Sequence, residues 1–381
     1  MYEVQMFDKN WSRVAVLDQY ESLIWTDRYN SAGDFEISMD PTISAFDKIK
    51  LGNYIHIDGT DRYMIVEDIE LNSDAKDGGK LVISGSSLES ILNRRVIFDD
   101  INIDSNIFFF MESLLNNNFI LPNDARKVPN LSLDRPSLIA LIDYRFSTKH
   151  NKGSNVYDIV SDICKQCGIG FKITMPEKIG DMVFGLFRGR NLSGGTDGIA
   201  SGEQNPNRTG VYYVPEIEPD PKMQRVVFSP KYDNLSSSNY IMNQTEEKNV
   251  SLVLGEGEGS SKKTYTYYVD ENISGLDRKE TSTDASSISS KEGDTTLTDT
   301  RYKELLEDKG REDILQKIAY SVFDGEVNPN VMYKYGVDFR IGDIVKIENE
   351  YGYSSSSRIT EYIRSVNTSE GLREYPTFEA L

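Results

Sequence analysis

The feature that most constrains the fold is a series of short apolar–polar alternations in the first hundred residues. Phe35, Ile37 and Met39 alternate with other residues, as side chains on a half-buried β-strand do. Asp58-Gly59 is a turn sequence between two such segments. Strands are predicted at 2–7, 13–17, 35–39, 54–57, 62–67 and 80–85. Several short strands at this spacing indicate a β-barrel or a β-sandwich.

From about residue 101 the pattern changes to a mixture of helices and strands. Asp104 or Ser105 is predicted to cap a helix. The apolar face of that helix would contain Ile107, Phe110, Met111, Leu114 and Leu115. A strand is predicted at 138–146, a second helix at 156–167, and strands at 170–174 and 182–188. This middle portion is therefore expected to be an α+β domain.

The last part of the chain returns to strands and contains one predicted helix. The segment 189–210 is rich in Gly, Asn, Ser and Thr, so a long exposed loop is expected there. Strands are predicted at 211–214, 225–229, 249–254 and 265–269, a helix at 300–322, and strands again beyond 330. The segment 277–299 is rich in Ser, Thr, Asp and Glu and has no assigned role. No repeat with a period of 20–50 residues is found, and the predicted class is α+β and β-rich.

The charge of the chain excludes one large class of function. It has 42 Lys and Arg against 61 Asp and Glu, a net charge of −19. A free-standing nucleic-acid-binding protein needs clustered cations to displace phosphate counterions, so neither specific nucleic-acid binding nor attraction to anionic membranes is expected. No run of about 18 apolar residues predicts a membrane-spanning helix, and no leader peptide is visible. We therefore expect the chain to stay in the cytoplasm until another component carries it out.

The cysteines and histidines give weak signals for chemistry. Cys164 and Cys167 form a Cys-x-x-Cys pair, but they share a helical stripe that ends at Gly168. One such pair supplies two of the four ligands of a structural zinc, so two core thiols are expected instead. His56 lies inside an apolar strand and His150 in a polar stretch, and neither has the neighbours of a catalytic triad.

Acidic residues offer several tempting arrangements, which an acidic chain produces by chance. Asp338 with Asp343, and Asp270 with Glu271, could pass for a carboxylate pair. The segment 255–259 alternates Gly with Glu, which is a poor phosphate cradle. Alternating oxygen ligands as in a calcium loop occur at Asp324, Glu326, Asn328 and Asn330, although an acidic turn is the preferred interpretation there. We therefore expect no catalytic, cofactor-binding or metal-binding residues and no enzymatic activity.

An ordered set of short motifs spans nearly the whole chain. The motifs are Trp25-Thr26-Asp27-Arg28-Tyr29, Gly33-Asp34-Phe35-Glu36-Ile37, Ile83-Ser84-Gly85 with Leu88 and Ile91-Leu92-Asn93-Arg94-Arg95, Val226-Val227-Phe228-Ser229 with Asn234-Leu235 and Tyr240, Arg278-Lys279-Glu280, and Asp338-Phe339-Arg340-Ile341-Gly342-Asp343-Ile344-Val345. In this order the motifs resemble the siphophage tail-tip hub (tail-associated, baseplate hub-like) family. In the last motif, Gly342 is suited to a strand bend, so Asp338 and Asp343 are interpreted as strand-end and turn residues.

The resemblance implies a hub fold with two tube-type β domains and smaller α+β domains. The implied division is 1–100 for the first tube-type domain, 101–210 for an α+β domain, 211–270 plus 330–381 for the second tube-type domain, and 271–329 for a helix-containing peripheral insert. It also implies a homotrimeric ring with six tube-type domains around the tail axis. Three chains would carry a charge of −57 (3 × −19), which suits a channel that must not bind DNA.

The same resemblance implies the partners and the location. The ring would contact the distal tail protein on one side and a tip fibre or receptor-binding protein on the other. The tape-measure protein and then the genome would pass through it. The expected location is the virion tail tip after assembly in the bacterial cytoplasm. Because many members continue into receptor-binding or lytic modules and this sequence ends at Leu381, such activities are expected on another chain or on a segment outside this sequence. A carbohydrate- or receptor-binding tail protein remains the alternative, and a peptidoglycan hydrolase a weaker one.

Overall fold

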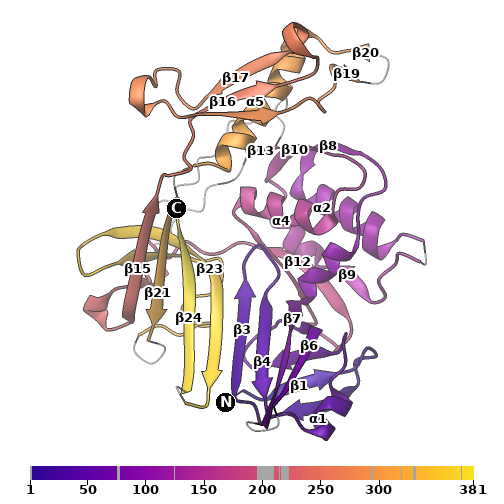
Figure 1. Cartoon of the computed structure of the whole chain (residues 1–381), viewed down its shortest axis with the longest axis vertical. Coiled ribbons are helices and arrows are strands. Elements are labelled where there is room, and N and C mark those ends of the chain that lie inside the picture. Colours follow the sequence, from indigo (N-terminus) through magenta and orange to yellow (C-terminus); the bar gives the residue numbers. More distant parts are fainter. Residues whose placement is uncertain are drawn as a thin grey trace.

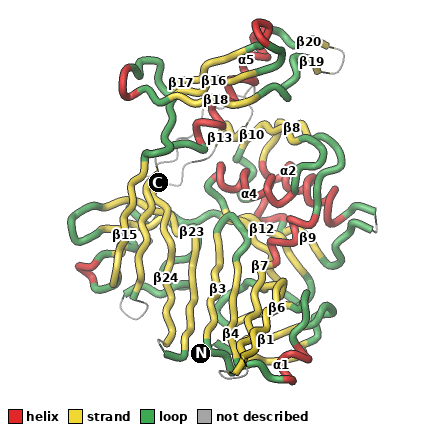
Figure 2. The backbone as a smooth tube through the Cα atoms, in the orientation of Figure 1, coloured by secondary structure: helices red, strands yellow, loops and turns green. Residues whose placement is uncertain are grey.

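The chain folds into a large sheet, an α+β region and a small inserted unit (Figure 1, Figure 2). The computed structural model describes residues 2–74, 78–123, 125–194, 210–213, 215, 223–292, 295–318, 320–328, 332–369 and 371–381. The β-rich α+β class predicted from the sequence is confirmed.

The large sheet has 13 strands, drawn from both ends of the chain. Its strand order is β15 (Leu235–Asn243), β21 (Tyr320–Val327), β24 (Gly371–Ala380), β23 (Ser354–Asn367), β3 (Ser22–Arg28), β4 (Asp34–Met39), β7 (Gly78–Ser87), β6 (Met64–Asp74), β5 (Tyr54–Ile57), β1 (Val4–Phe7) and β2 (Arg13–Leu17). β22 (Ile344–Glu348) pairs with β23, and β14 (Val227–Phe228) pairs with β22. The short helix α1 (Ile43–Lys48) follows β4, and a 3-10 turn, η3 (Pro230–Tyr232), precedes β15.

The same five-strand arrangement occurs twice in this sheet. Strands β3, β4, β7, β6 and β5 form it in the N-terminal half, and β15, β21, β24, β23 and β22 form it in the C-terminal half. The fourth strand of each half carries a bulge, between Val66 and Asp68 in β6 and between Ile359 and Glu361 in β23. A bulge bends a strand, so one strand can serve two sheets. Before the bulge each of these strands pairs with the fifth strand of its half.

The turn before the fifth strand is also duplicated. Gly52 and Gly342 both have positive φ, 82° and 90°. The Gly52 amide donates to the Val66 carbonyl at 2.7 Å, and the Gly342 amide donates to the Ile359 carbonyl at 2.8 Å. A left-handed backbone at this point favours glycine, which explains why the two halves share it.

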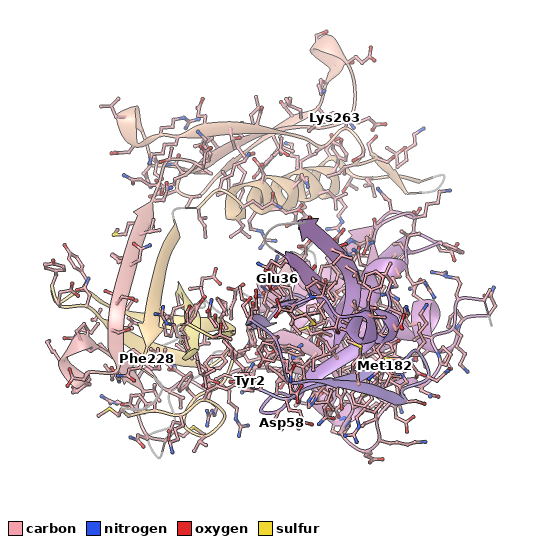
Figure 3. All side chains as sticks on the ribbon, turned by 60° about the horizontal axis from the view of Figure 1, so that its bottom comes forward. Tyr2, Glu36, Asp58, Met182, Phe228 and Lys263 are labelled. Carbon is pink, nitrogen blue, oxygen red and sulfur yellow. The ribbon has the colours of Figure 1, made fainter. Side chains whose placement is uncertain are left out.

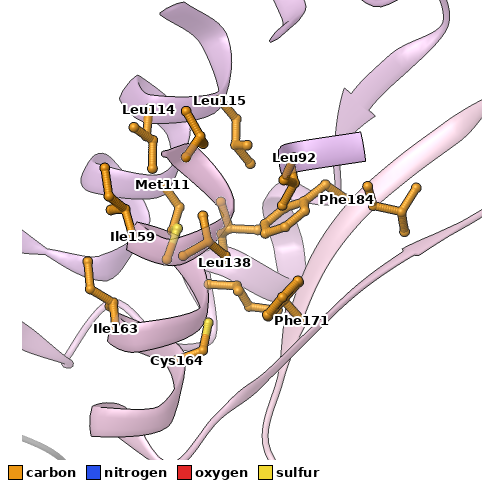
Figure 4. Close-up of a cluster of buried hydrophobic side chains, with 14 of the residues drawn as sticks. Leu92, Met111, Leu114, Leu115, Leu138, Ile159, Ile163, Cys164, Phe171 and Phe184 are labelled. Carbon is orange, nitrogen blue, oxygen red and sulfur yellow. The ribbon is translucent and has the colours of Figure 1, made fainter. Parts of the chain in front are cut away.

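The α+β region lies between the two halves in sequence and packs beside the N-terminal half. It contains η1 (Leu88–Arg94), β8 (Ile101–Asn106), α2 (Ile107–Leu115), η2 (Asn116–Ile120), β9 (Leu131–Leu133), α3 (Arg135–Ile139), β10 (Arg145–His150), α4 (Val156–Cys167), β11 (Gly170–Thr174), β12 (Met182–Phe187) and β13 (Gly210–Tyr213). Its strands form two three-stranded sheets, β13-β10-β8 and β11-β12-β9. Figure 4 shows its core, where side chains from α2, α3 and α4 meet Phe171 and Phe184.

The inserted unit leaves the large sheet between β15 and β21. It contains β16 (Val250–Leu254), η4 (Gly259–Ser261), β17 (Thr264–Tyr268), η5 (Gly275–Asp277), β18 (Glu280–Asp284), β19 (Lys291–Glu292), β20 (Thr295–Thr296) and α5 (Asp299–Leu315). Val253, Tyr302 and Leu306 form a small core of its own between sheet and helix. The unit, which carries Lys263, lies beyond one end of the large sheet (Figure 1, Figure 3).

The strand predicted at 138–146 is wrong. The structure has helix α3 there, followed by turns and then β10. The Asp134 side chain accepts a hydrogen bond from the Ser137 amide, and Pro136 occupies the first helical turn, which favours a helix start. Asp104 and Ser105, predicted to cap the helix α2, lie in strand β8, and Asn106 is the cap.

The assignment of the strands near 249–270 and of the helix at 300–322 also needs correction. The strands at 249–254 and 265–269, assigned to the second tube-type domain, belong to the inserted unit as β16 and β17. The helix ends at Leu315, and the backbone of β21 instead pairs with β15 and β24. Apolar spacing does not separate the end of a helix from a following strand, and tertiary pairing decides the boundary.

The loop predicted at 189–210 is not exposed at its start. Asn191, Leu192 and Ser193 are buried, and the Leu192 amide donates to the Ile344 carbonyl at 2.7 Å. The rest of that prediction, at 195–209, falls outside the described residues.

Candidate assembly surface

The two halves of the large sheet are joined by direct strand pairing. β3 and β23 pair along seven residues, from Arg28 opposite Glu361 to Ser22 opposite Asn367. We call this junction the seam. It joins segments from opposite ends of the chain, so it fixes the position of one half relative to the other.

A buried ion pair lies on the seam. The Asp27 carboxylate accepts from the Arg364 guanidinium at 2.7 Å, with side chains only 4% and 2% exposed. The same carboxylate accepts from the Trp25 indole at 3.0 Å and from the Thr60 hydroxyl at 3.0 Å. A buried charge pair is tolerated when its remaining hydrogen-bonding capacity is used, as it is here. These four residues come from three separate strands or turns and act as one unit.

Aromatic rings enclose the cation of that pair. The guanidinium of Arg364 lies 5.3 Å from the ring centre of Tyr335 and 4.9 Å from that of Tyr362. The two rings stack at 3.7 Å, and the Tyr362 hydroxyl donates to the Glu374 carboxylate at 3.1 Å. Burial raises the pKa of Tyr335 and Tyr362, so both phenols remain neutral at physiological pH.

Tyr29 holds the α+β region to both halves. Its hydroxyl donates to the Gly168 carbonyl at 3.0 Å and accepts from the Gly189 amide at 3.2 Å. Its ring lies where a side chain on Gly342 would be, since a Cβ there would come within 2.3 Å of Cε2 of Tyr29. Gly189 is equally constrained, because its Cβ would lie 1.7 Å from the Gly342 carbonyl oxygen. Close backbone approach therefore explains both glycines.

Asp343 is a turn residue, as the sequence predicts. It is buried and accepts from the Arg190 amide at 2.7 Å, from the Arg190 guanidinium at 2.5 Å and from the Arg340 amide at 2.9 Å. Asp338 accepts from the Lys334 amide at 2.8 Å through its carboxylate. Both carboxylates thus bind their own local backbone, and the pair has a structural explanation.

A second buried ion pair links the N-terminal half to the α+β region. The Arg62 guanidinium pairs with the Glu89 carboxylate, which also accepts from the Ile173 amide at 2.7 Å. Arg62 donates in addition to the Arg28 carbonyl at 3.2 Å. Three polar contacts, at Asp27, Asp343 and Glu89, therefore organise the places where the parts of the chain meet.

The other acidic candidates do not come together as a site. Asp270 accepts from the Asn272 amide at 2.8 Å, which lowers its pKa and closes a turn. Glu271 lies in the same turn and is exposed. The Gly255–259 segment is a turn next to Tyr302, whose hydroxyl accepts from the Glu256 amide at 2.8 Å.

The calcium loop considered at Asp324 and Glu326 is wrong, because both residues lie in a strand. The acidic turn, which was the preferred interpretation there, is wrong for the same reason. Asp324 and Glu326 lie in strand β21, which pairs with β15. Asn328 follows the strand, and Asn330 falls outside the described residues. No cluster of three or more His, Cys, Asp or Glu that could hold a metal ion occurs among the residues described.

Each of the two histidines has a structural environment, and His56 lies next to Thr60, a partner of Asp27. A ring nitrogen of His56 is 3.0 Å from the Thr60 carbonyl, and the ring stacks on Tyr63 at 4.5 Å. Burial lowers the pKa of His150 in β10, so it is mostly neutral at pH 7. Their surroundings explain both as structural residues.

The two cysteines are core thiols, as predicted. Cys164 and Cys167 are free and buried on α4, which ends at Gly168 in the left-handed conformation. Burial raises the pKa of both thiols, so little thiolate exists at neutral pH.

We expect a thiol-specific chromogenic reagent to modify neither cysteine in the native protein and both in denaturant. A Ser286→Cys variant, at an exposed position, should react at once; reaction of the native wild-type chain at a comparable rate would contradict this assignment.

The large sheet has one apolar face and one polar face. Leu23, Ile37 and Ile83 are partners across neighbouring strands and lie in the core. Side chains alternate along a strand, so their neighbours point the other way. The polar face carries Asp34, Glu36, Asp68, Glu70, Glu361 and Glu379, together with Arg28, Lys80 and Arg373. Carboxylates therefore outnumber cations among the described side chains of this face.

The eight-stranded run from β15 to β6 ends in two edges that lack a strand partner among the described residues. β15 pairs on one side only, with β21. β6 pairs with β5 through Met64 and Ile65, and after its bulge it pairs with β7 alone. We call β15 and the β6 stretch from Asp68 to Asn72 the open edges. Open edges are templates for pairing with another chain.

The sequence alone located neither the seam nor the particular strands that form the open edges. Tyr335, Arg364 and Glu374 carry no motif that marks them as partners of the N-terminal strands. A signal for the duplication does exist, because Leu51-Gly52-Asn53 corresponds to Ile341-Gly342-Asp343. A search for short periods cannot find a repeat whose copies lie at opposite ends of the chain.

Among the residues that the structure describes, no helix is both long and apolar enough to cross a bilayer.

Comparison with known proteins identifies the family. The model for the Siphovirus ReqiPepy6 Gp37-like protein family matches residues 3–377. No curated protein matches the sequence significantly. The tail protein from Neisseria meningitidis is similar in structure, with a TM-score of 0.55 and 12% identity over 99% of this chain and 96% of that one.

Two prophage proteins show the same fold. The 43 kDa tail protein of prophage MuSo2 from Shewanella oneidensis has a TM-score of 0.53 and 12% identity, covering 100% of this chain and 98% of that one. Prophage tail protein gp18 from Listeria monocytogenes has a TM-score of 0.51 and 11% identity, covering 99% and 94%. The resemblance to siphophage tail proteins inferred from the motifs is confirmed. The chain belongs to the Siphovirus ReqiPepy6 Gp37-like protein family and has the fold of phage tail proteins.

Proposed function

We propose that three copies of this chain form a ring at the tip of a phage tail, with the polar face of the large sheet lining its channel. The family and the fold support a structural role in the tail. The observation that carries the proposal is the eight-stranded run, which has one buried apolar face, one polar face and two open edges. A sheet of this kind is completed by neighbours that continue it around an axis.

The dimensions of such a ring suit its role. Three copies of eight strands give 24 strands in all. At a strand spacing of about 4.8 Å, 24 strands close into a barrel at least about 37 Å across between backbones. Much smaller barrels of membrane porins already enclose aqueous channels. The tape-measure protein and then the genome would leave the virion through this channel.

The charge of the channel wall suits the passage of a polyanion. Among the described side chains of the polar face, carboxylates outnumber cations, so they offer no cation cluster that would hold phosphates. The ring's two ends would contact the distal tail protein and a tip fibre or receptor-binding protein. Its assembly would take place in the bacterial cytoplasm, and no catalytic step belongs to this role.

Reversing charges on the polar face tests the channel assignment. The variant Glu36→Lys with Glu70→Lys replaces two carboxylates of this face by ammonium groups, a change of four charge units in each chain. We expect it to assemble normally but to bind duplex DNA in a salt-dependent manner, because added cations release phosphate counterions. Phage carrying it should eject their genomes more slowly.

A matched control keeps the same net charge but places it elsewhere. Glu177→Lys with Asp181→Lys alters two exposed carboxylates of the α+β region. Fluorescence anisotropy with labelled DNA, and genome release from assembled virions, should separate the two variants. Equal behaviour of the two variants in genome release would argue against the polar face as the channel wall.

A further inference from the structure

We propose that neighbouring copies of this chain join β15 of one copy to the second half of β6 of the next, in the register of the internal seam. This inference rests on the proposed ring and names the residues that would close it. Within the chain, the fourth strand of the C-terminal half (β23) pairs after its bulge with the first strand of the N-terminal half (β3). The fourth strand of the N-terminal half (β6) has no such partner after its bulge in the described structure.

The first strand of the C-terminal half, β15, is the strand that corresponds to the missing partner of β6. It is the counterpart of β3, because each pairs with the second strand of its half, β21 or β4. All neighbours in the eight-stranded run are antiparallel, so a following β15 would again be antiparallel to β6. The next copy thus supplies a strand of the correct type, position and direction.

The bulges fix the register on β6. Glu361 is the first paired residue after the bulge of β23, and Asp68 is the first after the bulge of β6. Their partners on the following strand of each hairpin, Thr377 and Ser84, correspond in the same way. Asp68 therefore takes the place of Glu361, and each later residue of β6 takes the place of the next residue of β23.

The second-strand partners fix the register on β15. Thr377 pairs with Asp324 and Ser84 pairs with Glu36, so Asp324 corresponds to Glu36. The β15 partner of Asp324 is Asn239, and the β3 partner of Glu36 is Ile24. Asn239 therefore corresponds to Ile24.

Transfer of the seam pairing to the open edges gives one set of partners between copies. In the seam, Ile24 lies opposite Ser365, the fourth residue after Glu361. The inferred partners are Asp68 with Asn243, Ile69 with Met242, Glu70 with Ile241, Leu71 with Tyr240, and Asn72 with Asn239.

This register is also the one that the side chains favour. Leu71 is 47% exposed and Met242 is 73% exposed in the single chain. Both fall on the apolar face in the inferred pairing, beside Tyr240 and Ile69. Exposed apolar side chains that become buried together supply the association energy. A slip by one residue would turn each of them toward the polar face.

The composition of β15 supports the same conclusion. The sequence from 234 to 245 contains no charged residue, although charged residues make up 27% of the chain. Natural edge strands are usually protected against pairing by charges, bulges or prolines. An uncharged edge strand of nine residues indicates an edge that is meant to be paired.

A disulfide between copies tests the register. Asn72→Cys with Asn239→Cys, in the full chain, places two thiols directly opposite each other, within disulfide reach. Under mild oxidation we expect covalent dimers and trimers on a non-reducing gel. The native thiols do not interfere, since both are buried. The control Asn72→Cys with Asn243→Cys is displaced by four residues, about 13 Å along the strand, and should stay monomeric on the gel.

The possible results are distinguishable from each other. A trimeric mass in solution without the expected cross-link, or with the control cross-linked instead, overturns the register but leaves the ring. A chain that stays monomeric in solution and also fails to cross-link overturns both the register and the proposed ring.

A substitution at the same edge gives a second readout. Met242→Asp should leave folding unchanged, because the residue is exposed, but weaken association by about tenfold or more by placing a carboxylate in an apolar contact. Leu121→Asp, at a residue 71% exposed that follows η2 in the α+β region, is the matched control. Equal association constants for the two variants would overturn the proposed interface.

Discussion

Replacing Arg364 by alanine is expected to lower the free energy of unfolding by about 3–5 kcal/mol, because it leaves the buried Asp27 carboxylate without its cation. The substitution also removes the guanidinium that lies over the rings of Tyr335 and Tyr362. The seam should loosen first. The chain has two tryptophans, Trp11 and Trp25, and Trp25 donates to Asp27, so urea unfolding followed by Trp25 fluorescence in a Trp11→Phe background reports on the seam directly.

Two variants make this result specific. Arg278→Ala removes one partner of the solvent-accessible pair with Glu280 in the inserted unit and should leave the urea midpoint almost unchanged. Asp27→Leu combined with Arg364→Met removes both charges and should recover part of the loss, since replacing a whole buried pair is far less costly than breaking it. An Arg364→Ala protein as stable as the Arg278→Ala protein would contradict the role assigned to the seam.

Gly342→Ala is expected to destabilise the chain strongly, because it adds a clash to an unfavourable backbone conformation. The residue has φ of 90°, and its Cβ would lie 2.3 Å from Cε2 of Tyr29. Backbone strain costs about 1–3 kcal/mol and overpacking a further 1–3 kcal/mol. Because Tyr29 also binds Gly168 and Gly189, its displacement should separate the α+β region from both halves. Thermal unfolding and limited proteolysis would measure this loss.

The duplication provides a matched control for that prediction. Gly52 occupies the same turn in the N-terminal half with φ of 82°, and its Cβ would meet only the flexible end of the Lys9 side chain, at 2.8 Å. Gly52→Ala should therefore cost the backbone strain alone. Equal destabilisation by the two substitutions would show that contact with Tyr29 adds nothing at Gly342.

Local signals in the sequence predicted many of the elements. The strand β5 and the helix α4 with its Gly168 cap lie where the pattern placed them, because alternation and helical spacing are properties of the element itself. The helix α3 was missed, since Leu138 and Leu141 are apolar residues that suit a strand as well as a helix. The side chain of Asp134 caps the start of α3, which favours a helix over a strand there.

Contacts between distant parts of the chain could not be predicted from the sequence, for a physical reason. The pairing of β3 with β23 joins residues more than 330 positions apart, as in the contact of Arg28 with Glu361. No local propensity records such a contact. The motifs around Asp27 and Asp343 pointed to the correct family, but only the structure shows that these side chains hold the seam and the adjoining turn. The candidate site could therefore be found as a set of motifs and not as an arrangement.

In the proposed ring, each chain completes its large sheet by association with two further copies. Sedimentation equilibrium of the full chain over a range of concentrations tests this most directly. A ring of three copies predicts a mass that rises to three times 43.2 kDa and does not increase further. A mass that remains at 43.2 kDa at every concentration, or that settles at twice this value, would contradict it.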